Sequence, residues 1–403
     1  MIKRDLYLNK ITSYIDKPFI KVLVGIRRVG KSTLLGQLED ILIARGVSPE
    51  QIVHINFENL SYLSVRDKAT FIDLVDELIN VRHKKYFLFD EIQNVEGWDE
   101  VVNGMMAEYS VDIYVTGSNS KLLSRELSTH LTGRYVNIEV YPLNFAEYLT
   151  FRRASHADIS DLKAEFRRFA DRGGFPALHV NDLELSQCDD LTADIYTSIV
   201  FRDLIERHNI RNTELLARVV KFIFDNIGNP FSAKSITDYL KNEKRSLTPE
   251  TIYNYLDWLE EAFVIKRISR YDLRGKEILS TNEKYYLGDV GLLYAVGGRQ
   301  NSYLSGILEN IVLNELLSRG YQVNIGKNQS AEIDFVATKK STKIYLQIAA
   351  SLAEKTTIDR EYAAFAGIDD NYPKYILTLD QPFGENRDGI RCVNLPEFLL
   401  SLE

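Results

Sequence analysis

The chain of 403 residues carries a formal net charge of −8 at pH 7, with 45% hydrophobic and 26% charged residues. Its length exceeds what one hydrophobic core usually supports, so we expect two or three domains of a globular protein. The acidic total excludes a global basic footprint for nucleic acid but allows a local basic patch. Two cysteines without metal or disulfide spacing, and the lack of a signal-type or long uncharged apolar run, favour a cytoplasmic protein with no membrane segment.

An N-terminal helix at 6–15 and a short apolar strand at 20–24 precede residues 25–32. These read GIRRVGKS and match the phosphate-binding pattern G-x-x-x-x-G-K-[ST] at every fixed position. Such a loop points successive backbone N–H groups at a triphosphate, and the N-terminus of the following helix adds its positive end. A chance glycine-rich turn is the alternative. The expected nucleotide-binding residues are Gly25, Arg28, Val29, Gly30, Lys31, Ser32 and Thr33.

Lys31 and Ser32 have distinct expected roles in this loop. Lys31 is expected to reach the β- and γ-phosphates, and the Ser32 hydroxyl to ligate Mg²⁺. A second signature lies at 86–91, where an apolar strand ends in Asp90 and Glu91. Parallel sheets bind ligands at the carboxyl ends of such strands, so we expect Asp90 to hold the magnesium shell and Glu91 to orient or activate the attacking water. The alternative is a strand that ends in solvated acids.

Further strands are expected at 51–57, 112–116 and 136–140. In P-loop ATPases with a catalytic glutamate, the strand between the acidic strand and the phosphate-loop strand ends in a polar residue that senses the γ-phosphate. Asn119 or Ser118, after the strand at 112–116, is therefore the candidate sensor. The alternative is ordinary turn chemistry in a Gly-Ser-Asn sequence.

Arg134 stands just before the last of these strands. An arginine donated across a subunit boundary can stabilise charge on the γ-phosphate, and Arg134 is the first candidate for this role, with Arg125 the second. The role implies a homo-oligomer. The alternative is an arginine that fixes the strand edge to a nearby helix.

The phosphate loop, the acidic strand, Thr116-Gly117-Ser118, residues 131–134 and residues 142–148 together resemble prokaryotic AAA-type P-loop ATPases fused to a C-terminal domain of unknown function. The resemblance covers nearly the whole chain. It implies ATP as the nucleotide, Mg²⁺ as the cofactor and ATP hydrolysis as the activity, and no guanine-reading Asn-Lys-x-Asp motif contradicts ATP.

The expected fold is α/β, with four parts. A P-loop parallel sheet of about five strands forms an ATPase core at 1–150, and a helical lid or linker follows at 151–210. Three short helices and a β-hairpin at 211–279 predict a winged-helix domain. A C-terminal α/β domain at 280–403 has the element order of the restriction-endonuclease-like fold, and we expect it to be catalytically inactive.

Winged helices often bind duplex DNA, and this segment carries a local set of basic side chains that could contact phosphates. The presumed recognition helix, however, exposes Asp257, Glu260 and Glu261. A packing or dimerisation module is therefore the alternative. The basic residues are Lys241, Lys244, Arg245, Arg267, Arg270, Arg274 and Lys276.

Nucleases of the fold expected at 280–403 hold a metal with two carboxylates and use a lysine to assist the attacking water. In this chain Gln347 takes the place of the acid on the third strand and Ala349 that of the lysine, and Lys355 can substitute only by folding back from the next helix. The possible remnant of the site is Glu309, Glu332, Asp334 and Gln347.

The sequence thus predicts a Mg²⁺-dependent ATPase whose nucleotide cycle rearranges C-terminal binding domains that act on DNA or on a protein partner. Two alternatives remain open. One is an ATP-regulated nuclease that acts on DNA, and the other is a regulatory or scaffold ATPase that binds only protein.

Overall fold

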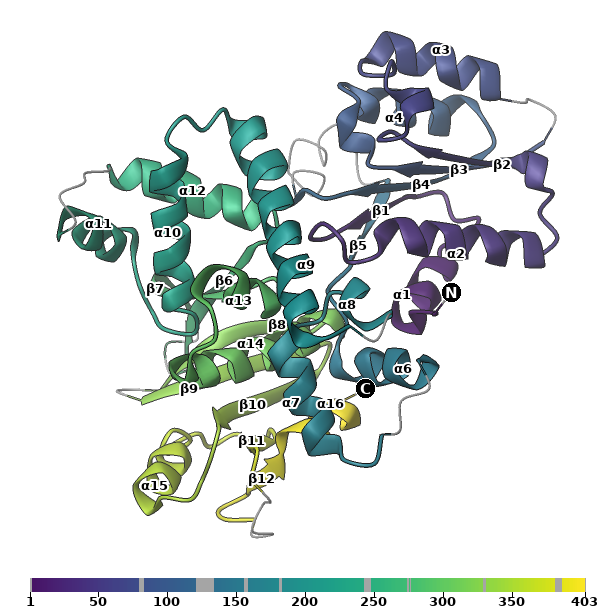
Figure 1. Ribbon diagram of the computed structural model, residues 1–403. Helices are drawn as coiled ribbons and strands as arrows, with labels where there is room; N and C mark the ends of the chain where they lie inside the picture. The colour runs from purple at the N-terminus through teal and green to yellow at the C-terminus, as the bar shows by residue number, and fades with distance from the viewer. Residues whose placement is uncertain are drawn as a thin grey trace. The chain divides into compact units, whose positions relative to one another are not determined.

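The computed structural model describes residues 2–79, 83–120, 134–155, 159–180, 183–242, 248–273, 275, 277–328, 331–380 and 386–402 (Figure 1). It divides the chain into two compact units. The first is Met1–Val140 with Glu261–Phe263, and the second is Tyr141–Glu260 with Val264–Glu403. No helix in these described ranges is long and apolar enough to cross a membrane.

The first unit is built on a parallel sheet of five strands in the order β2-β3-β4-β1-β5. The five expected strands are confirmed, with small differences at their ends. Figure 1 shows α1 and α2 on one side of this sheet and α3 and α4 on the other. The strands are β1 Ile20–Val24, β2 Ile52–Asn56, β3 Lys85–Asp90, β4 Val111–Gly117 and β5 Tyr135–Glu139. The helices are α1 Asp5–Thr12, α2 Lys31–Ala44, α3 Lys68–Leu78 and α4 Trp98–Glu108, with short 3₁₀ turns at Pro49–Gln51, Leu60–Tyr62 and Ile92–Asn94.

The burial of each strand agrees with its position in the sheet. All five residues of β1 are buried, as are the last five of β3, because helices cover both faces of the central strands. All pairs are parallel, so the carboxyl ends of β1, β3 and β4 lie at one edge of the sheet. The phosphate loop, the two carboxylates and the candidate sensor each follow one of these strands, and the sheet therefore brings them to the same edge.

The second unit contains a mixed sheet of seven strands in the order β12-β11-β10-β9-β8-β6-β7. Its strands are β6 Ile265–Asp272, β7 Glu277–Leu287, β8 Gln322–Asn328, β9 Ala331–Lys339, β10 Thr342–Ala349, β11 Lys374–Thr378 and β12 Ile390–Asn394. Its helices are α6 Phe145–Ala154, α7 Leu162–Arg172, α8 Ala177–Val180, α9 Leu185–Ser198, α10 Thr213–Asp225, α11 Ala233–Asn242, α12 Pro249–Glu261, α13 Gly291–Gly297, α14 Leu304–Ser318, α15 Lys355–Ala363 and α16 Leu395–Ser401; a π-helix at Ile199–Glu206 extends α9, and a 3₁₀ turn at Asn301–Tyr303 precedes α14.

The β-hairpin expected after three short helices is confirmed, because β6 and β7 pair antiparallel after α10, α11 and α12. The strands β9 and β10 also pair antiparallel. The β6–β7 hairpin is not a separate element, because β6 also pairs with β8 through Arg270–Ile325 and Asp272–Lys327. The proposed boundary at 279/280 consequently falls inside β7, while the division of the chain into four domains stays a prediction.

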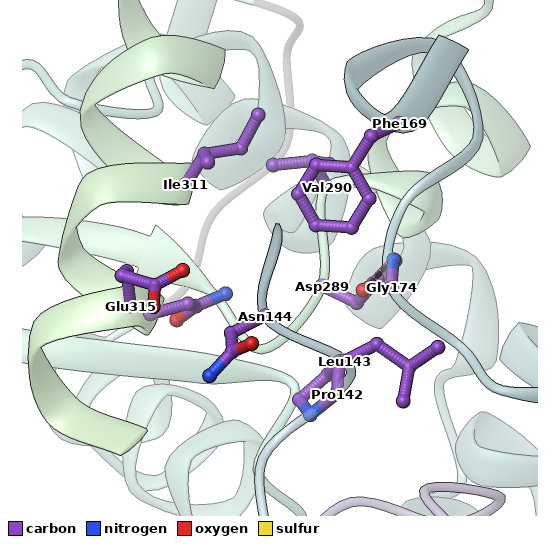
Figure 2. A pocket seen from close by; sticks show the side chains of 10 residues that line it. Pro142, Leu143, Asn144, Phe169, Gly174, Asp289, Val290, Ile311 and Glu315 are labelled. Atoms are coloured by element: carbon purple, nitrogen blue, oxygen red, sulfur yellow. Dashed lines mark hydrogen bonds between the residues drawn. The ribbon is translucent and has the colours of Figure 1, made fainter. Parts of the chain in front are cut away.

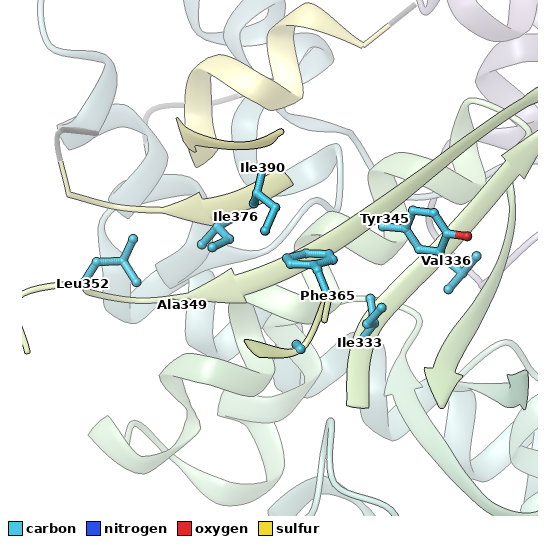
Figure 3. Close-up of a cluster of buried hydrophobic side chains, with 9 residues drawn as sticks. Ile333, Val336, Tyr345, Ala349, Leu352, Phe365, Ile376 and Ile390 are labelled. Atoms are coloured by element: carbon cyan, nitrogen blue, oxygen red, sulfur yellow. The ribbon is translucent and has the colours of Figure 1, made fainter. Parts of the chain in front are cut away.

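Nine buried residues form an apolar cluster between β9, β10, β11 and the segment that follows α15 (Figure 3). Tyr345 and Phe365 are its largest members, and both are less than 5% exposed. The cluster holds in place the two strands that carry Asp334 and Gln347. Its members are Ile333, Val336, Tyr345, Ala349, Leu352, Ala364, Phe365, Ile376 and Ile390.

Candidate functional site

The loop between β1 and α2 has the backbone conformation that a phosphate-binding loop requires. Gly25, Arg28 and Gly30 have φ angles of 151°, 73° and 93°, a region that glycine adopts without strain. A Cβ on Gly25 would lie 2.1 Å from the carbonyl oxygen of Val140, so only glycine fits at that position. The Val29 side chain is fully buried, which leaves the backbone of this residue to face the loop.

Lys31 folds back over the loop. Its side chain is buried, and its ammonium donates hydrogen bonds to the carbonyl oxygens of Gly25 at 2.8 Å and of Ile26 at 3.2 Å. These carbonyls hold the cation among the backbone groups that the motif predicts to surround a phosphate. Ser32 and Thr33 are exposed on the first turn of α2.

Arg4 supports the loop from outside the motif. Its guanidinium donates to the carbonyl oxygen of Val29 at 2.8 Å, lies 4.5 Å from the centre of the Tyr7 ring, and is buried. The same N-terminal segment contacts α2, because the Gln37 amide donates to the carbonyl oxygen of Ile2 at 2.8 Å. Sequence reasoning missed Arg4, since no motif marks a basic residue that precedes a first helix.

Asp90 is held by three hydrogen bonds at the end of β3. Its Oδ1 accepts from the Thr116 hydroxyl, its Oδ2 accepts from the Asn56 amide at 2.8 Å, and the Ser32 hydroxyl also donates to it. Burial raises the pKa of this carboxyl, and the hydrogen bonds from Ser32 and Thr116 lower it only in part. Ser32 and Asp90, both predicted as magnesium ligands, are thus in direct contact.

This donor set fits Mg²⁺. A hydroxyl and a carboxylate are the hard oxygen ligands that Mg²⁺ takes from proteins, usually in small number. Burial alone disfavours the charged form of Asp90, so a cation beside it would be favoured electrostatically.

Glu91 has a left-handed backbone, with φ 55° and ψ 45°, which is uncommon for a residue other than glycine. Its N–H donates to the Thr116 hydroxyl at 3.0 Å, and its carboxylate accepts from the Gln93 amide. The same amide lies 3.5 Å from the Ser118 hydroxyl. The Thr116 hydroxyl therefore bonds both Asp90 and Glu91, and it is the second residue that sequence reasoning missed.

Comparison with known proteins agrees with this geometry. A family model described as an AAA domain matches residues 17–149, and a model described as a domain of unknown function (DUF8612) matches residues 163–303. An uncharacterized protein of Haemophilus influenzae is 39% identical over 403 residues, which cover 99% of each chain. The chain belongs to this family of AAA-type ATPases.

Two more distant similarities accompany these matches. An uncharacterized protein of Methanocaldococcus jannaschii is 30% identical over 91% of this chain and 81% of its own. The solved structure of a Walker-type ATPase of Pyrococcus abyssi is 16% identical, covers 73% of this chain and 96% of its own, and has a TM-score of 0.45.

The candidate sensor stands where it was expected in the sheet of the first unit. The strand β4 lies between β3 and β1, and Ser118 and Asn119 directly follow it with buried side chains. The Gln93 amide contacts the Ser118 hydroxyl and also donates to the Glu91 carboxylate, so it connects this turn with Glu91. The role of Asn119 as a sensor stays a prediction.

Arg134 lies at the opposite edge of the same sheet. Its carbonyl oxygen accepts from the N–H of Ile20, at the start of β1, and its side chain is exposed. A strand of this length spans about 16 Å, so Arg134 is remote from the phosphate loop of its own chain. Its predicted action on a neighbouring subunit remains a prediction, and Arg125 lies outside the described residues.

One of the predicted DNA contacts, Arg267, forms ion pairs within the protein. The Arg267 guanidinium lies 2.5 Å from a carboxylate oxygen of Asp257 and 3.0 Å from one of Glu260, both on α12. The acidic residues of the presumed recognition helix thus neutralise the basic residue of the hairpin. Four of the other predicted phosphate contacts, Lys244, Arg245, Arg274 and Lys276, lie outside the described residues.

The remnant nuclease residues come together in the second unit. Glu309 on α14 and Glu332 and Asp334 on β9 lie around one lysine, Lys284 of β7. Gln347 on β10 joins the group through Asp334, whose N–H donates to its side-chain oxygen. Lys355, the substitute considered from the sequence, is exposed on the first turn of α15. Lys284 is the third residue that sequence reasoning missed, because the nuclease pattern places its lysine on the third strand of the fold and Lys284 lies on β7.

A small cavity in the second unit is lined by two carboxyl groups with raised pKa values (Figure 2). Asp289 accepts hydrogen bonds from the N–H groups of Gly174 at 2.6 Å and Gly291 at 2.8 Å, and burial raises the pKa of Asp289 to about 7. Burial also raises the pKa of Glu315 to about 6, although the Arg319 guanidinium opposes this. Glycine is required at Gly173, where a Cβ would lie 2.1 Å from Asp289 Oδ1.

We expect Asp289 to make stability depend on pH. The folded-state pKa of about 7 exceeds the ordinary 3.8, so the folded state binds the extra proton, and stability falls as pH rises from about 4 to about 7. The change is on the order of 4 kcal/mol. Urea unfolding of the wild type and Asp289→Asn between pH 4 and 8 measures it as a difference, in which the contribution of Glu315 cancels. A difference that is constant with pH would contradict the assignment.

Proposed function

We propose that this protein is a Mg²⁺-dependent ATP hydrolase in which the Thr116 hydroxyl fixes the metal-binding carboxylate of Asp90 and the backbone of the catalytic residue Glu91 relative to each other. One observation carries the proposal. The bonds from Thr116 to Asp90 and Glu91, with the Ser32 contact to Asp90, link the phosphate loop, the acidic strand and β4 into one polar set.

Each residue then has a definite task. Lys31 exchanges the carbonyl oxygens of Gly25 and Ile26 for phosphate oxygens of ATP, since charge-assisted hydrogen bonds to phosphate are stronger. The loop N–H groups bind the remaining phosphate oxygens. Ser32 and Asp90 hold the metal, and the chemistry that Mg²⁺ supplies when bound is neutralisation of phosphate charge.

Glu91 orients the attacking water and takes up its proton. Its carboxylate is held by the Gln93 amide in the nucleotide-free arrangement, and this amide also reaches Ser118. Release of Glu91 from Gln93 when a γ-phosphate contacts the β4 turn would tie hydrolysis to correct nucleotide binding.

The same proposal includes coupling to the downstream domains. The Val140 N–H donates to the Val24 carbonyl beside the phosphate loop, at 2.7 Å, and three residues later the Leu143 N–H donates to the Gly174 carbonyl at 2.7 Å. Asp289 in turn binds the Gly174 N–H. A backbone shift at Gly25 on nucleotide binding would pass along this short covalent segment to the turn at Gly173 and Gly174.

The Thr116→Val variant tests both the proposed ATP hydrolysis and the role of the Thr116 hydrogen bonds to Asp90 and Glu91. The variant loses the hydroxyl that bonds the Asp90 carboxylate and the Glu91 N–H. Loss of a hydrogen bond of this kind corresponds to about a ten- to hundredfold fall in the rate of hydrolysis. Phosphate release with Mg²⁺ and ATP measures hydrolysis, and a fluorescent ATP analogue measures binding, which should change little.

Thr116→Ser is the matched control, because it keeps the hydroxyl and should keep most of the activity. If the wild type hydrolyses no ATP with Mg²⁺, the proposed function is wrong. If the wild type hydrolyses ATP and Thr116→Val is as active, the linking role of Thr116 is wrong.

A further inference from the structure

The carboxylate cluster around Lys284 contains its own cation. The Lys284 ammonium lies 2.7 Å from Glu332 Oε1 and 3.5 Å from Glu309 Oε2, and Lys284 and Glu309 are both buried. The Tyr286 hydroxyl also donates to Glu309 Oε2, at 2.8 Å. A lysine from β7 thus joins a carboxylate from α14 to a carboxylate from β9.

Asp334 and Gln347 are also committed to partners within the protein. Asp334 Oδ2 accepts from the Ile348 N–H at 2.8 Å, and the Gln347 side-chain oxygen accepts from the Asp334 N–H at 3.2 Å. The amide oxygen that would substitute for an acidic metal ligand is therefore bonded to the backbone. The two strands are cross-linked by side chains that a nuclease of this fold would direct at a metal.

These residues do not fit a divalent metal. A hard cation of this kind takes six or more oxygen ligands in proteins and water, and it needs carboxylates that converge on one point. Among the residues that the structure describes, no group of three or more His, Cys, Asp or Glu side chains could hold a metal ion. The point between Glu309 and Glu332 is taken by the Lys284 ammonium, whose charge would repel a second cation.

We infer that the Lys284 ammonium occupies the place where a nuclease of this fold holds its divalent cation. The carboxylates around it then form an internal ion cluster that joins β7, α14 and β9. The lysine supplies the compensation that buried carboxylates need. This inference is independent of the ATPase site. It accounts for the absence of an acid at Gln347 and of a lysine at Ala349, since neither is needed where no metal is bound.

The inference predicts that removal of the lysine creates a metal site. Lys284→Met keeps most of the side-chain volume and leaves Glu309, Glu332 and Asp334 without a cation. Titration of the nucleotide-free full chain with MnCl₂, followed by electron paramagnetic resonance of free Mn²⁺, should reveal one additional bound Mn²⁺ per chain in this variant. Mn²⁺ should also raise its thermal unfolding midpoint by at least about 2 °C.

Two further variants assign the new site. Lys284→Arg keeps a cation at this position and should gain no Mn²⁺ site, and Asp334→Asn added to Lys284→Met should abolish the gain. A folded Lys284→Met chain that binds no additional Mn²⁺ overturns the inference. The wild type provides a test even if Lys284→Met does not fold: equal Mn²⁺ binding by the wild type and Asp334→Asn supports the inference, and loss of a bound Mn²⁺ in Asp334→Asn overturns it.

Discussion

The Glu91→Gln variant should bind ATP about as tightly as the wild type and hydrolyse it about a hundred- to ten-thousandfold more slowly, the range expected when a general base is removed. Glutamine has nearly the same shape and can still accept a hydrogen bond from Gln93, so the left-handed turn at residue 91 should persist. What is lost is the group that takes up the proton of the attacking water. Single-turnover hydrolysis of ATP measures the chemical step, and a fluorescent analogue measures binding.

Glu96→Gln is the matched control, because Glu96 is an exposed glutamate a few residues further along the same segment. It should leave both binding and hydrolysis unchanged. A Glu91→Gln variant with normal hydrolysis would remove Glu91 from the mechanism. A variant that loses binding to the same extent as hydrolysis would make Glu91 a residue that shapes the loop.

The parts of the fold that the sequence predicts are those encoded locally. The phosphate loop is a contiguous motif, and the run that ends in Asp90 and Glu91 identifies its strand without knowledge of any neighbour. Alternation and apolar runs likewise predict all five strands of the first sheet. Once β4 is placed between β3 and β1, its last residues must lie beside Asp90, so Thr116 was within reach of the same reasoning.

The parts that the sequence does not predict depend on tertiary contacts. Arg4 reaches the loop only because the N-terminal segment packs against α2. Lys284 enters the carboxylate cluster because β6 pairs with β8, and this brings the hairpin partner β7 into the same sheet as β9. Neither the packing of the N-terminal segment nor the pairing of β6 with β8 has a local sequence signature. The nuclease pattern predicts a lysine on β10 or α15, whereas the lysine of the cluster lies on β7.

Charge pairing within the second unit occupies one predicted DNA contact and the centre of the possible nuclease remnant. Arg267 is bound by Asp257 and Glu260, and Lys284 by Glu309 and Glu332. In each case the cation is neutralised by carboxylates of its own unit. The measurements on Thr116 and Lys284 variants address the two units independently.

The Lys31→Met variant should lose at least about thirtyfold in ATP affinity, because a charge-assisted hydrogen bond to phosphate contributes more than about 2 kcal/mol. Its hydrolysis should be undetectable at ATP concentrations that saturate the wild type. The folded protein should tolerate the change, since the hydrogen bonds that Lys31 makes to the carbonyl oxygens of Gly25 and Ile26 lie within its own loop. Calorimetric titration with ATP and Mg²⁺ measures the affinity.

Lys17→Met is the matched control, because Lys17 is an exposed lysine just before β1 and contributes only its carbonyl oxygen to the contact with Lys21. It should bind and hydrolyse ATP normally. Comparison with Glu91→Gln then separates two causes of inactivity: the lysine variant should fail at binding, and the glutamate variant only at hydrolysis. If Lys31→Met binds ATP with wild-type affinity, the loop at 25–32 is not the triphosphate site, and the contact of Ser32 with Asp90 has no bearing on nucleotide.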